Sequence, residues 1–143
     1  MSPTAIRWIV TGALLGALGI ILGAYGAHGL ENQLVKMGFD ADLEKRLANF
    51  DTAARYQMYA AVVLVLIGLL LDRQKSRVWI ASAAAIFIGT LIFSGLLYVM
   101  VFNGPQLKWL GAIVPIGGGL MILGWLGIAV GAMTVTRNSE PRT

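Results

Sequence analysis

Four long apolar runs, nearly free of charged residues, constrain the fold more than any other feature of this sequence. The runs cover residues 8–27, 52–71, 78–102 and 109–135, and residues 28–51 form a long link between the first two. A helix needs ~20 mostly apolar residues to cross ~30 Å of hydrocarbon at ~1.5 Å per residue. We therefore predict that residues 1–143 form a single integral membrane domain with four transmembrane helices.

The overall composition excludes the main alternatives to a membrane protein. Hydrophobic residues make up 57% of the chain and charged residues only 13%, whereas soluble domains carry ~25% charged residues. Too little charge is present to cover the surface of a water-soluble globule. The chain also has no cysteine, which removes disulfides, thiolate metal sites and thiol catalysis.

The links between the runs predict how the helices are connected. Residues 72–77 and 103–108 are short links with charged or turn-forming residues, so the second, third and fourth spans should be antiparallel neighbours. The first link carries an apolar stripe at helical spacing, namely Leu43, Leu47, Phe50 and Ala54. This stripe predicts an amphipathic helix that starts near Asp40 or Asp42 and runs into the second span.

The predicted fold class is therefore an all-α membrane protein. It is a four-transmembrane-helix antiparallel bundle with an amphipathic helical extension before the second span. The apolar stripe of the extension should lie on the bundle or at the level of the lipid headgroups.

Charged residues are distributed unevenly between the two ends of such a bundle. Four spans place the N-terminus, the second link and the C-terminus on one side. That side carries Arg7, Arg73, Lys75, Arg77, Arg137 and Arg142, against Asp72 and Glu140. The other side holds equal numbers of basic and acidic residues, Lys108 among them. Since short basic links stay in the cytoplasm, we predict a multi-pass protein of the cytoplasmic (inner) membrane in the N-in/C-in orientation.

Glycines recur at the spacing of a helix-packing seam in two of the runs. In the first span they are Gly12, Gly16, Gly19, Gly23 and Gly26, with steps of four and three residues. In the fourth span they are Gly117, Gly124, Gly127 and Gly131. Small residues let helix backbones approach closely in lipid, so these two spans are plausible partners. A seam between copies of the chain in a homo-oligomer is the alternative.

Pro115 lies in the fourth run, directly before a group of three glycines. Proline removes one backbone hydrogen bond inside a helix. The sequence therefore predicts a kink in the fourth helix. The alternative is an unwound segment that exposes backbone groups to a ligand.

Polar side chains near the end of the first span and the start of the second form the candidate functional site. The two groups should reach the same membrane face, and a tyrosine of the third span can reach across to them. The candidate polar pocket consists of His28, Tyr25, Asp51, Arg55, Gln57 and Tyr98. It could hold an anionic or quinone-like headgroup. The alternative is that the tyrosines and Arg55 are ordinary interfacial anchors.

The sequence contains no recognisable catalytic or metal-binding arrangement. It lacks a nucleophile beside a base, a carboxylate pair within a span and a phosphate-binding loop. His28 is the only histidine, and zinc or copper needs three or four ligands. We therefore expect no catalytic residues, no metal, no cofactor and no enzymatic activity. No basic and aromatic surface supports nucleic-acid binding.

Four segments of the chain resemble one known family. They are GAYGAHGL at 23–30, FDTAARYQMYA at 50–60, FSGLLYV at 93–99 and WLGAIVPIGGGLMILGWL at 109–126. Together they are similar to the DUF423 family, also called UPF0382, of small four-span membrane proteins. The resemblance implies an integral membrane protein without an established activity. The family usually has a histidine after the second tyrosine of its YQ-x-Y motif, and Ala60 at that position argues against a pair of histidines.

These observations lead to one functional expectation and one alternative. We expect a non-enzymatic structural, assembly or lipid- or partner-binding component of the cytoplasmic membrane. Its partners would be membrane lipids, and other membrane proteins or further copies of the chain are left open. The alternative is a small carrier or pore built as a homo-oligomer, which would require a solvated path between the helices.

Overall fold

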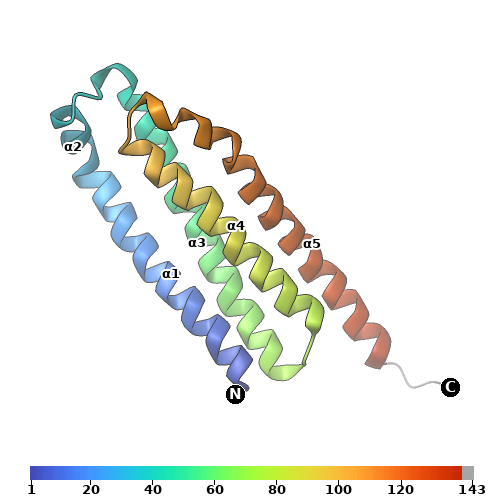
Figure 1. The fold of residues 1–143 in the computed structure, drawn as a ribbon. Coiled ribbons are helices and arrows are strands. Elements are labelled where there is room, and N and C mark those ends of the chain that lie inside the picture. The colour runs from blue at the N-terminus through green and yellow to red at the C-terminus, as the bar shows by residue number, and fades with distance from the viewer. Residues whose placement is uncertain (140–143) are drawn as a thin grey trace.

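Four long helices run antiparallel along the molecule in a computed structural model that describes residues 1–139, with the side chains of all but residues 105, 106, 108 and 135–139 (Figure 1). They are α1 Pro3–His28, α3 Leu43–Arg73, α4 Arg77–Val101 and α5 Val114–Ser139. Four segments are long and apolar enough to cross a membrane. The predicted all-α fold class with four spans is confirmed.

The long link contains the amphipathic extension, one additional α-helix and a short 3₁₀ helix. α3 is continuous from Leu43, so the extension and the second span are a single helix, as predicted. The short helices α2 Leu30–Lys36 and η1 Asp40–Asp42 precede it, and α2 was not predicted.

A turn that requires a glycine ends α2. Gly38 has a φ of 77°, in the left-handed region that favours glycine. Its N–H donates to the Val35 carbonyl at 2.9 Å, and the Phe39 N–H donates to the Leu34 carbonyl at 3.1 Å. These two hydrogen bonds form a Schellman motif, which reverses the chain and presses Phe39 toward the apolar stripe of α3.

The helices form an open row in which α1 packs on α3, α3 on α4 and α4 on α5 (Figure 1). Among the described residues, α1 and α5 do not pack against each other. The prediction that the first and fourth spans are partners is therefore wrong. The short link 74–76 joins α3 to α4, and residues 102–113, which include the 3₁₀ helix η2 Pro105–Ala112, join α4 to α5. Consecutive helices therefore stay side by side, and α1 is left to pack on α3 at the other edge of the row.

The glycines of α1 lie against α3 at four positions of the five. A Cβ at Gly12 would lie 2.6 Å from the Ala61 carbonyl oxygen, and one at Gly19 would lie 2.7 Å from the sulfur of Met58. At Gly26 it would lie 3.0 Å from the Phe50 ring, and at Gly16 it would make ordinary contact. Gly23 is the exception, because a Cβ there would have no neighbour within 4 Å.

The glycines of α5 lie against α4 and not against α1. A Cβ at Gly117 would lie 2.5 Å from the Phe93 backbone nitrogen. Gly124 faces Ile86, Gly127 faces Ser82 and Gly131 faces the Trp79 indole. Spacing within one helix detects that a face packs closely, but it does not identify the partner helix.

Pro115 does not kink a helix. A 3₁₀ segment, η2 Pro105–Ala112, precedes α5, which begins at Val114, so Pro115 is its second residue. The N–H of a residue in the first turn has no acceptor within the helix. Proline, which has no N–H, therefore costs the helix no hydrogen bond at this position. The predicted kink is wrong, and the fourth helix begins five residues later than residue 109.

The start of α1 and the end of α3 lie together at one end of the molecule. The Ser2 N–H donates to the Asp72 carboxylate at 2.8 Å, and the N-terminal ammonium lies 3.8 Å from the same carboxylate. The N-terminus and the link at residues 74–76 are thus on the same side. The side chains of Lys108 and Arg137, as well as Glu140 and Arg142, which entered the charge prediction, lie outside the described residues.

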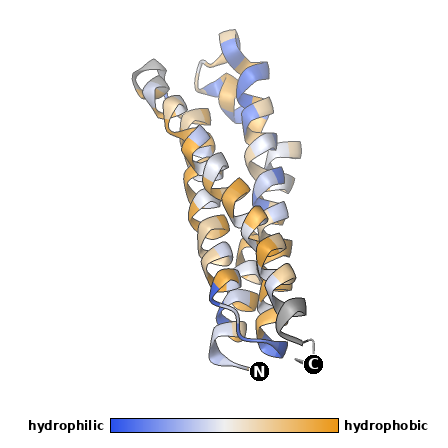
Figure 2. Cartoon of the chain, turned by 90° about the vertical axis from the view of Figure 1, so that its right-hand side faces the viewer, coloured by the Kyte–Doolittle hydropathy of each residue, from blue (hydrophilic) through white to orange (hydrophobic). Residues whose placement is uncertain are grey.

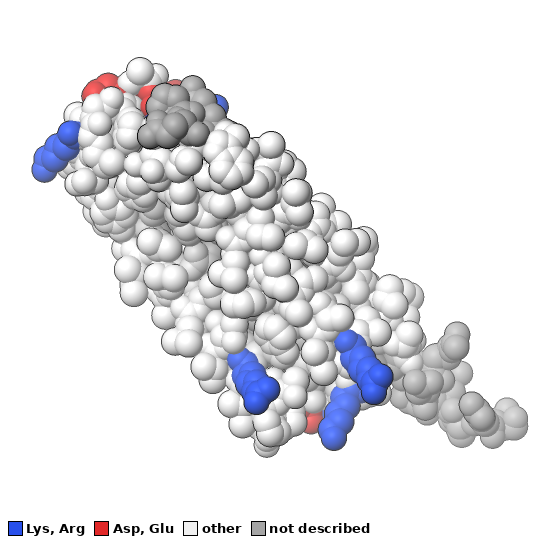
Figure 3. All heavy atoms as spheres, in the orientation of Figure 1, with Lys and Arg blue, Asp and Glu red and all other residues white. Residues whose placement is uncertain are grey.

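Hydropathy along the helices fits a membrane-spanning orientation. Hydrophilic residues gather toward the two ends of the molecule, and hydrophobic ones predominate between them (Figure 2). In the space-filling view, Lys and Arg residues are seen at both ends, whereas acidic residues are seen mainly at the upper end (Figure 3). Large exposed apolar side chains such as Leu14, Leu66 and Leu123 lie between the ends, where lipid would contact them.

Candidate functional site

The six residues of the predicted polar pocket occupy four different environments. Gln57 is 3% exposed inside the bundle, whereas Arg55 lies on its surface. Residues two positions apart on a helix point in nearly opposite directions. The prediction that Arg55 and Gln57 line one pocket together is therefore wrong.

Gln57 and Tyr98 form a buried hydrogen-bonded link between helices. The Tyr98 hydroxyl donates to Oε1 of Gln57 at 3.0 Å, and Nε2 of Gln57 donates to the Leu15 carbonyl at 2.9 Å. One glutamine thereby connects α1, α3 and α4. Because both ends of its amide are occupied within the protein, these two side chains stabilise helix packing.

The neighbouring hydroxyls of α4 do not extend this link. The Thr90 hydroxyl donates to the Ile86 carbonyl of its own helix at 2.8 Å, which is the back-bonding common in apolar helices. The buried Ser94 hydroxyl has no hydrogen-bond partner among the described residues.

Tyr25 belongs to an aromatic cluster that closes the same end of the bundle. Its ring centroid lies 6.1 Å from that of Phe50 and 6.5 Å from that of Phe102. Phe50 also packs edge-to-face on Tyr98 at 5.0 Å. Such aromatic contacts hold α1, α3 and α4 together where their spans end.

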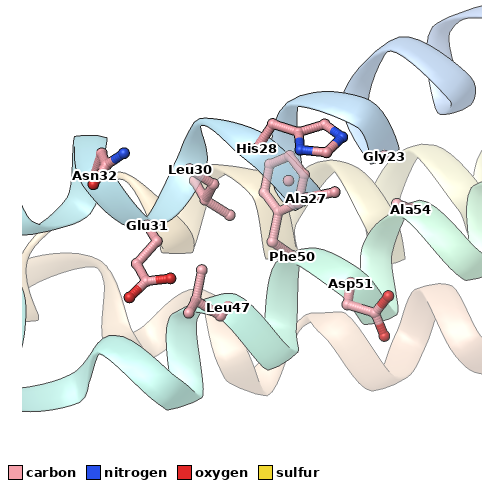
Figure 4. Close-up of a pocket in the computed structure, with 11 residues that line it drawn as sticks. Gly23, Ala27, His28, Leu30, Glu31, Asn32, Leu47, Phe50, Asp51 and Ala54 are labelled. Atoms are coloured by element: carbon pink, nitrogen blue, oxygen red, sulfur yellow. The ribbon is translucent and has the colours of Figure 1, made fainter.

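His28 and Asp51 line a cavity of about 350 Å³ between the α1–α2 corner and α3 (Figure 4). This volume is within the ~300–1,000 Å³ typical of small-molecule sites. The apolar part of its wall comes from Gly23, Gly26, Ala27, Leu30, Leu47, Phe50 and Ala54. The polar part comes from His28, Glu31, Asn32 and Asp51. The cavity explains why Gly23 has no close neighbour, since it separates α1 from α3 there.

The polar part of the cavity is acidic. Glu31 and Asp51 are its two charged residues, and no lysine or arginine lines it. Oδ2 of Asp51 accepts a hydrogen bond from Arg55, one helical turn away, in an ion pair whose side chains are both more than half exposed. Among the described residues, none donates a hydrogen bond or forms an ion pair with Glu31.

The cavity offers no metal centre within the part of the chain that the structure describes. No three histidine, cysteine, aspartate or glutamate side chains there come close enough to hold a metal ion. His28 and the two carboxylates bring hydrogen-bonding groups to the polar part of the cavity wall.

Arg46 is a buried charged residue that the sequence prediction overlooked. Its side chain is 9% exposed, and its guanidinium lies 3.7 Å from the centroid of the Phe39 ring. Nε donates to Asp42 at 2.7 Å. Nη1 donates to the carbonyls of Val101 at 2.6 Å and of Asn103 at 2.9 Å, with a longer contact to Met100.

These contacts give Arg46 a structural role at the end of α4. The last carbonyls of a helix have no intrahelical partner and carry partial negative charge. Arg46 satisfies them and at the same time anchors η1 and the start of α3. A signal was present in the sequence, because position 46 falls between Leu43 and Phe50 on the apolar stripe, where a charge needs a partner.

Comparisons with known proteins place the chain among membrane proteins without an assigned activity. The sequence profile described as "Protein of unknown function (DUF423)" matches residues 22–118. The UPF0382 membrane protein SSP2132 of Staphylococcus saprophyticus is 36% identical over 90% of this chain and 98% of its own length.

Similar proteins are found in other bacteria as well. The UPF0382 membrane protein YwdK of Bacillus subtilis is 35% identical, over 88% of this chain and 95% of its own length. A UPF0382 membrane protein of Haemophilus influenzae is 35% identical over 88% of this chain and 93% of its own length. No solved structure matches the chain.

Proposed function

The chain belongs to the DUF423 (UPF0382) family of membrane proteins, and on that premise we propose that it is a non-enzymatic, lipid-binding component of the cytoplasmic membrane. The observation that carries the proposal is the cavity between the α1–α2 corner and α3. One part of its wall is apolar and the other is polar, which is the character of a site for an amphipathic molecule.

The position of the cavity favours a lipid over a water-soluble ligand. Gly23 and Ala27 lie in the last turns of α1, and Ala54 lies where α3 becomes apolar. Glu31 and Asn32 lie beyond the end of α1, on α2. A lipid whose headgroup sits at the boundary of the membrane would meet these polar groups, and its acyl chains would follow the apolar residues toward the bilayer centre.

The structural contacts of the interior polar groups favour this role over a carrier or pore. Gln57, Tyr98 and Thr90 are engaged in hydrogen bonds within the protein. The buried charge of Arg46 lies at one end of the bundle and holds backbone carbonyls. Ion pathways usually place charged groups near the middle of the membrane, and the described spans carry their charges toward the ends.

We further propose that the basic link of residues 74–76 and its flanking arginines face the cytoplasm, which puts the cavity at the outer surface. Because the chain has no cysteine, single cysteines report orientation directly. In intact cells, Lys36→Cys should react with a membrane-impermeant maleimide, whereas Lys75→Cys should react only after permeabilisation. The reverse pattern would put the cavity at the cytoplasmic surface.

Filling the cavity should release the lipid. A Cβ at Gly23 meets nothing within 4 Å, so Gly23→Leu should fold normally while its side chain occupies the space between α1 and α3. We expect native mass spectra from mild detergent to show bound phospholipid on the wild-type protein and at least a severalfold loss of it on the variant.

Gly119→Leu is the matched control for this experiment. Gly119 is also a glycine of a spanning helix with open space around it, but it lies on α5, away from the cavity. It should retain lipid like the wild type. Lipid retained equally by all three proteins would refute the cavity as the binding site, and a wild-type protein without lipid would refute the lipid-binding function itself.

A further inference from the structure

We propose that the basic end of the molecule binds the phosphate of an anionic phospholipid, in a groove between the start of α1, the end of α3 and the start of α4. The groove and the cavity at Gly23 lie at opposite ends of the spans, so the inference goes beyond the proposed function and does not depend on it. Lys75 and Arg77 are the residues assigned to the phosphate. Phosphatidylglycerol is the probe, because its headgroup carries a phosphate and no cation.

The groove brings two basic side chains to one place. It has a volume of about 500 Å³, and its charged lining residues are Lys75 and Arg77, without a carboxylate. The two residues flank Ser76, whose backbone is extended, with a φ of −136° and a ψ of 120°. Residues two positions apart in extended backbone lie on the same side, with their Cα atoms within about 7 Å of each other. Both side chains can therefore reach a single phosphate.

Basic residues at this end lack carboxylate partners. They are Arg7, Arg73, Lys75 and Arg77. None of them forms an ion pair with a described residue. Asp72 is the one acidic residue that the structure describes at this end, and its carboxylate accepts the Ser2 N–H at 2.8 Å and lies 3.8 Å from the N-terminal ammonium. Lys and Arg side chains are prominent at the lower end in Figure 3. This end therefore carries an excess of positive charge.

Arg77 lies at a position where a positive charge is unfavourable for the helix itself. It is the first residue of α4, whose N-cap is Ser76, and the start of a helix carries partial positive charge from its free N–H groups. α1 also begins at the groove, with Ser2 as its N-cap. Neither helix has an acidic residue in its first turn. A bound anion would supply the negative charge that both helix starts lack.

The apolar part of the groove favours a lipid as the source of the phosphate. This part consists of Pro3, Leu71 and Ile80. Leu71 lies in the last turn of α3 and Ile80 in the first turn of α4, at the ends of two spanning helices. Ile80 is 38% exposed, so an acyl chain can contact it while the phosphate stays at the basic residues. Basic pockets between spanning helices are typical of sites for anionic headgroups.

The test compares two lipids that differ in headgroup charge. Phosphatidylcholine also has a phosphate, but its trimethylammonium group would lie among basic side chains, and like charges repel. The groove is open, so its lipid exchanges with detergent. The full-length protein is therefore stripped of lipid, mixed with equal amounts of phosphatidylglycerol and phosphatidylcholine of the same acyl chains, and analysed by native mass spectrometry.

We expect a preference of about tenfold for phosphatidylglycerol, because each basic residue near a headgroup contributes up to about a fivefold factor. The measurement is made on the wild type and on Gly23→Leu. The variant should show the same preference, since its substitution fills the cavity at the other end and leaves the groove unchanged.

The variant Lys75→Gln/Arg77→Gln should lower the preference to about twofold, since other basic residues remain nearby. Its matched control is Lys36→Gln/Lys45→Gln, which removes the same charge from the other end of the molecule and should keep the preference. The exchange Lys75→Arg/Arg77→Lys retains both charges and should keep it as well. All four substituted side chains are exposed, so the thermal midpoint should not change, and it is measured alongside.

The outcomes separate this site from the cavity. Equal binding of the two lipids by Gly23→Leu, or no binding of either, would overturn the anionic site and leave the cavity proposal intact. A preference that the control variant lowers as much as Lys75→Gln/Arg77→Gln does would overturn the assignment to the groove, because the net charge of the protein would then account for it. Binding of inorganic phosphate without any retained phosphatidylglycerol would identify a free phosphate as the ligand and overturn the lipid assignment.

Discussion

Gly12→Ala is expected to destabilise the protein, whereas Gly23→Ala in the same helix is expected to leave it as stable as the wild type or slightly more stable. At position 12 the new Cβ would lie 2.6 Å from the Ala61 carbonyl oxygen and 2.9 Å from the Val65 backbone nitrogen. Neither backbone atom can move without shifting α3. Overpacking of this kind costs about 1–3 kcal/mol.

At the control position 23, the added Cβ should not destabilise the protein. A Cβ there meets nothing within 4 Å, and alanine favours a helix over glycine by about 0.5–1 kcal/mol. The measurement is the thermal midpoint of unfolding in detergent, determined from the loss of folded protein with temperature. Equal midpoints for the two variants would contradict the close contact of α1 with α3.

The same comparison applies at the other edge of the row of helices. Gly117→Ala would bring a Cβ to 2.5 Å from the Phe93 backbone nitrogen, while Gly119→Ala would meet open space. We expect the first to be destabilised and the second not. A strong effect at both positions would indicate that α5 also packs closely on a further partner, such as a second copy of the chain.

Arg46→Met should be the most destabilising change of a charged residue in this chain. It removes hydrogen bonds to Asp42 and to the carbonyls of Val101 and Asn103, and it leaves the two carbonyls at the end of α4 without this donor. Loss of one partner from a buried charged network costs about 3–5 kcal/mol. We expect a clear drop in the free energy of unfolding, measured by titration of the helical signal with sodium dodecyl sulfate.

Arg55→Met is the matched control for Arg46. Like Arg46→Met, it replaces an arginine of α3 by methionine. Arg55, like Arg46, pairs with an aspartate four residues earlier. That pair is exposed, and such helical pairs contribute about 0.3–0.5 kcal/mol. Arg46→Lys should recover only part of the loss, since a lysine lacks the planar fork that reaches several acceptors. Similar losses for Arg46→Met and Arg55→Met would contradict the role assigned to Arg46.

Only part of the candidate site was predicted from the sequence. His28 and Asp51 were predicted as site residues, and both line the cavity. Glu31 and Asn32 were not assigned to the pocket, because no helix was predicted over residues 30–36 and only the fold of α2 brings them over α3. Gln57 and Tyr98 were assigned to the same pocket, yet they bond to each other inside the bundle.

The sequence by itself determined the four spans, the helix that continues from the end of the first link into the second span, and the placement of the N-terminus beside the second link. These features depend on local properties, namely the length of the apolar runs, the helical period and the short links. The tertiary structure alone decided which helix each glycine face meets, that Arg46 is buried against the end of α4, and that a cavity remains at Gly23. The reason is physical: two helices with similar seams can each pack on several partners in lipid, and only the combined packing of all four selects one arrangement.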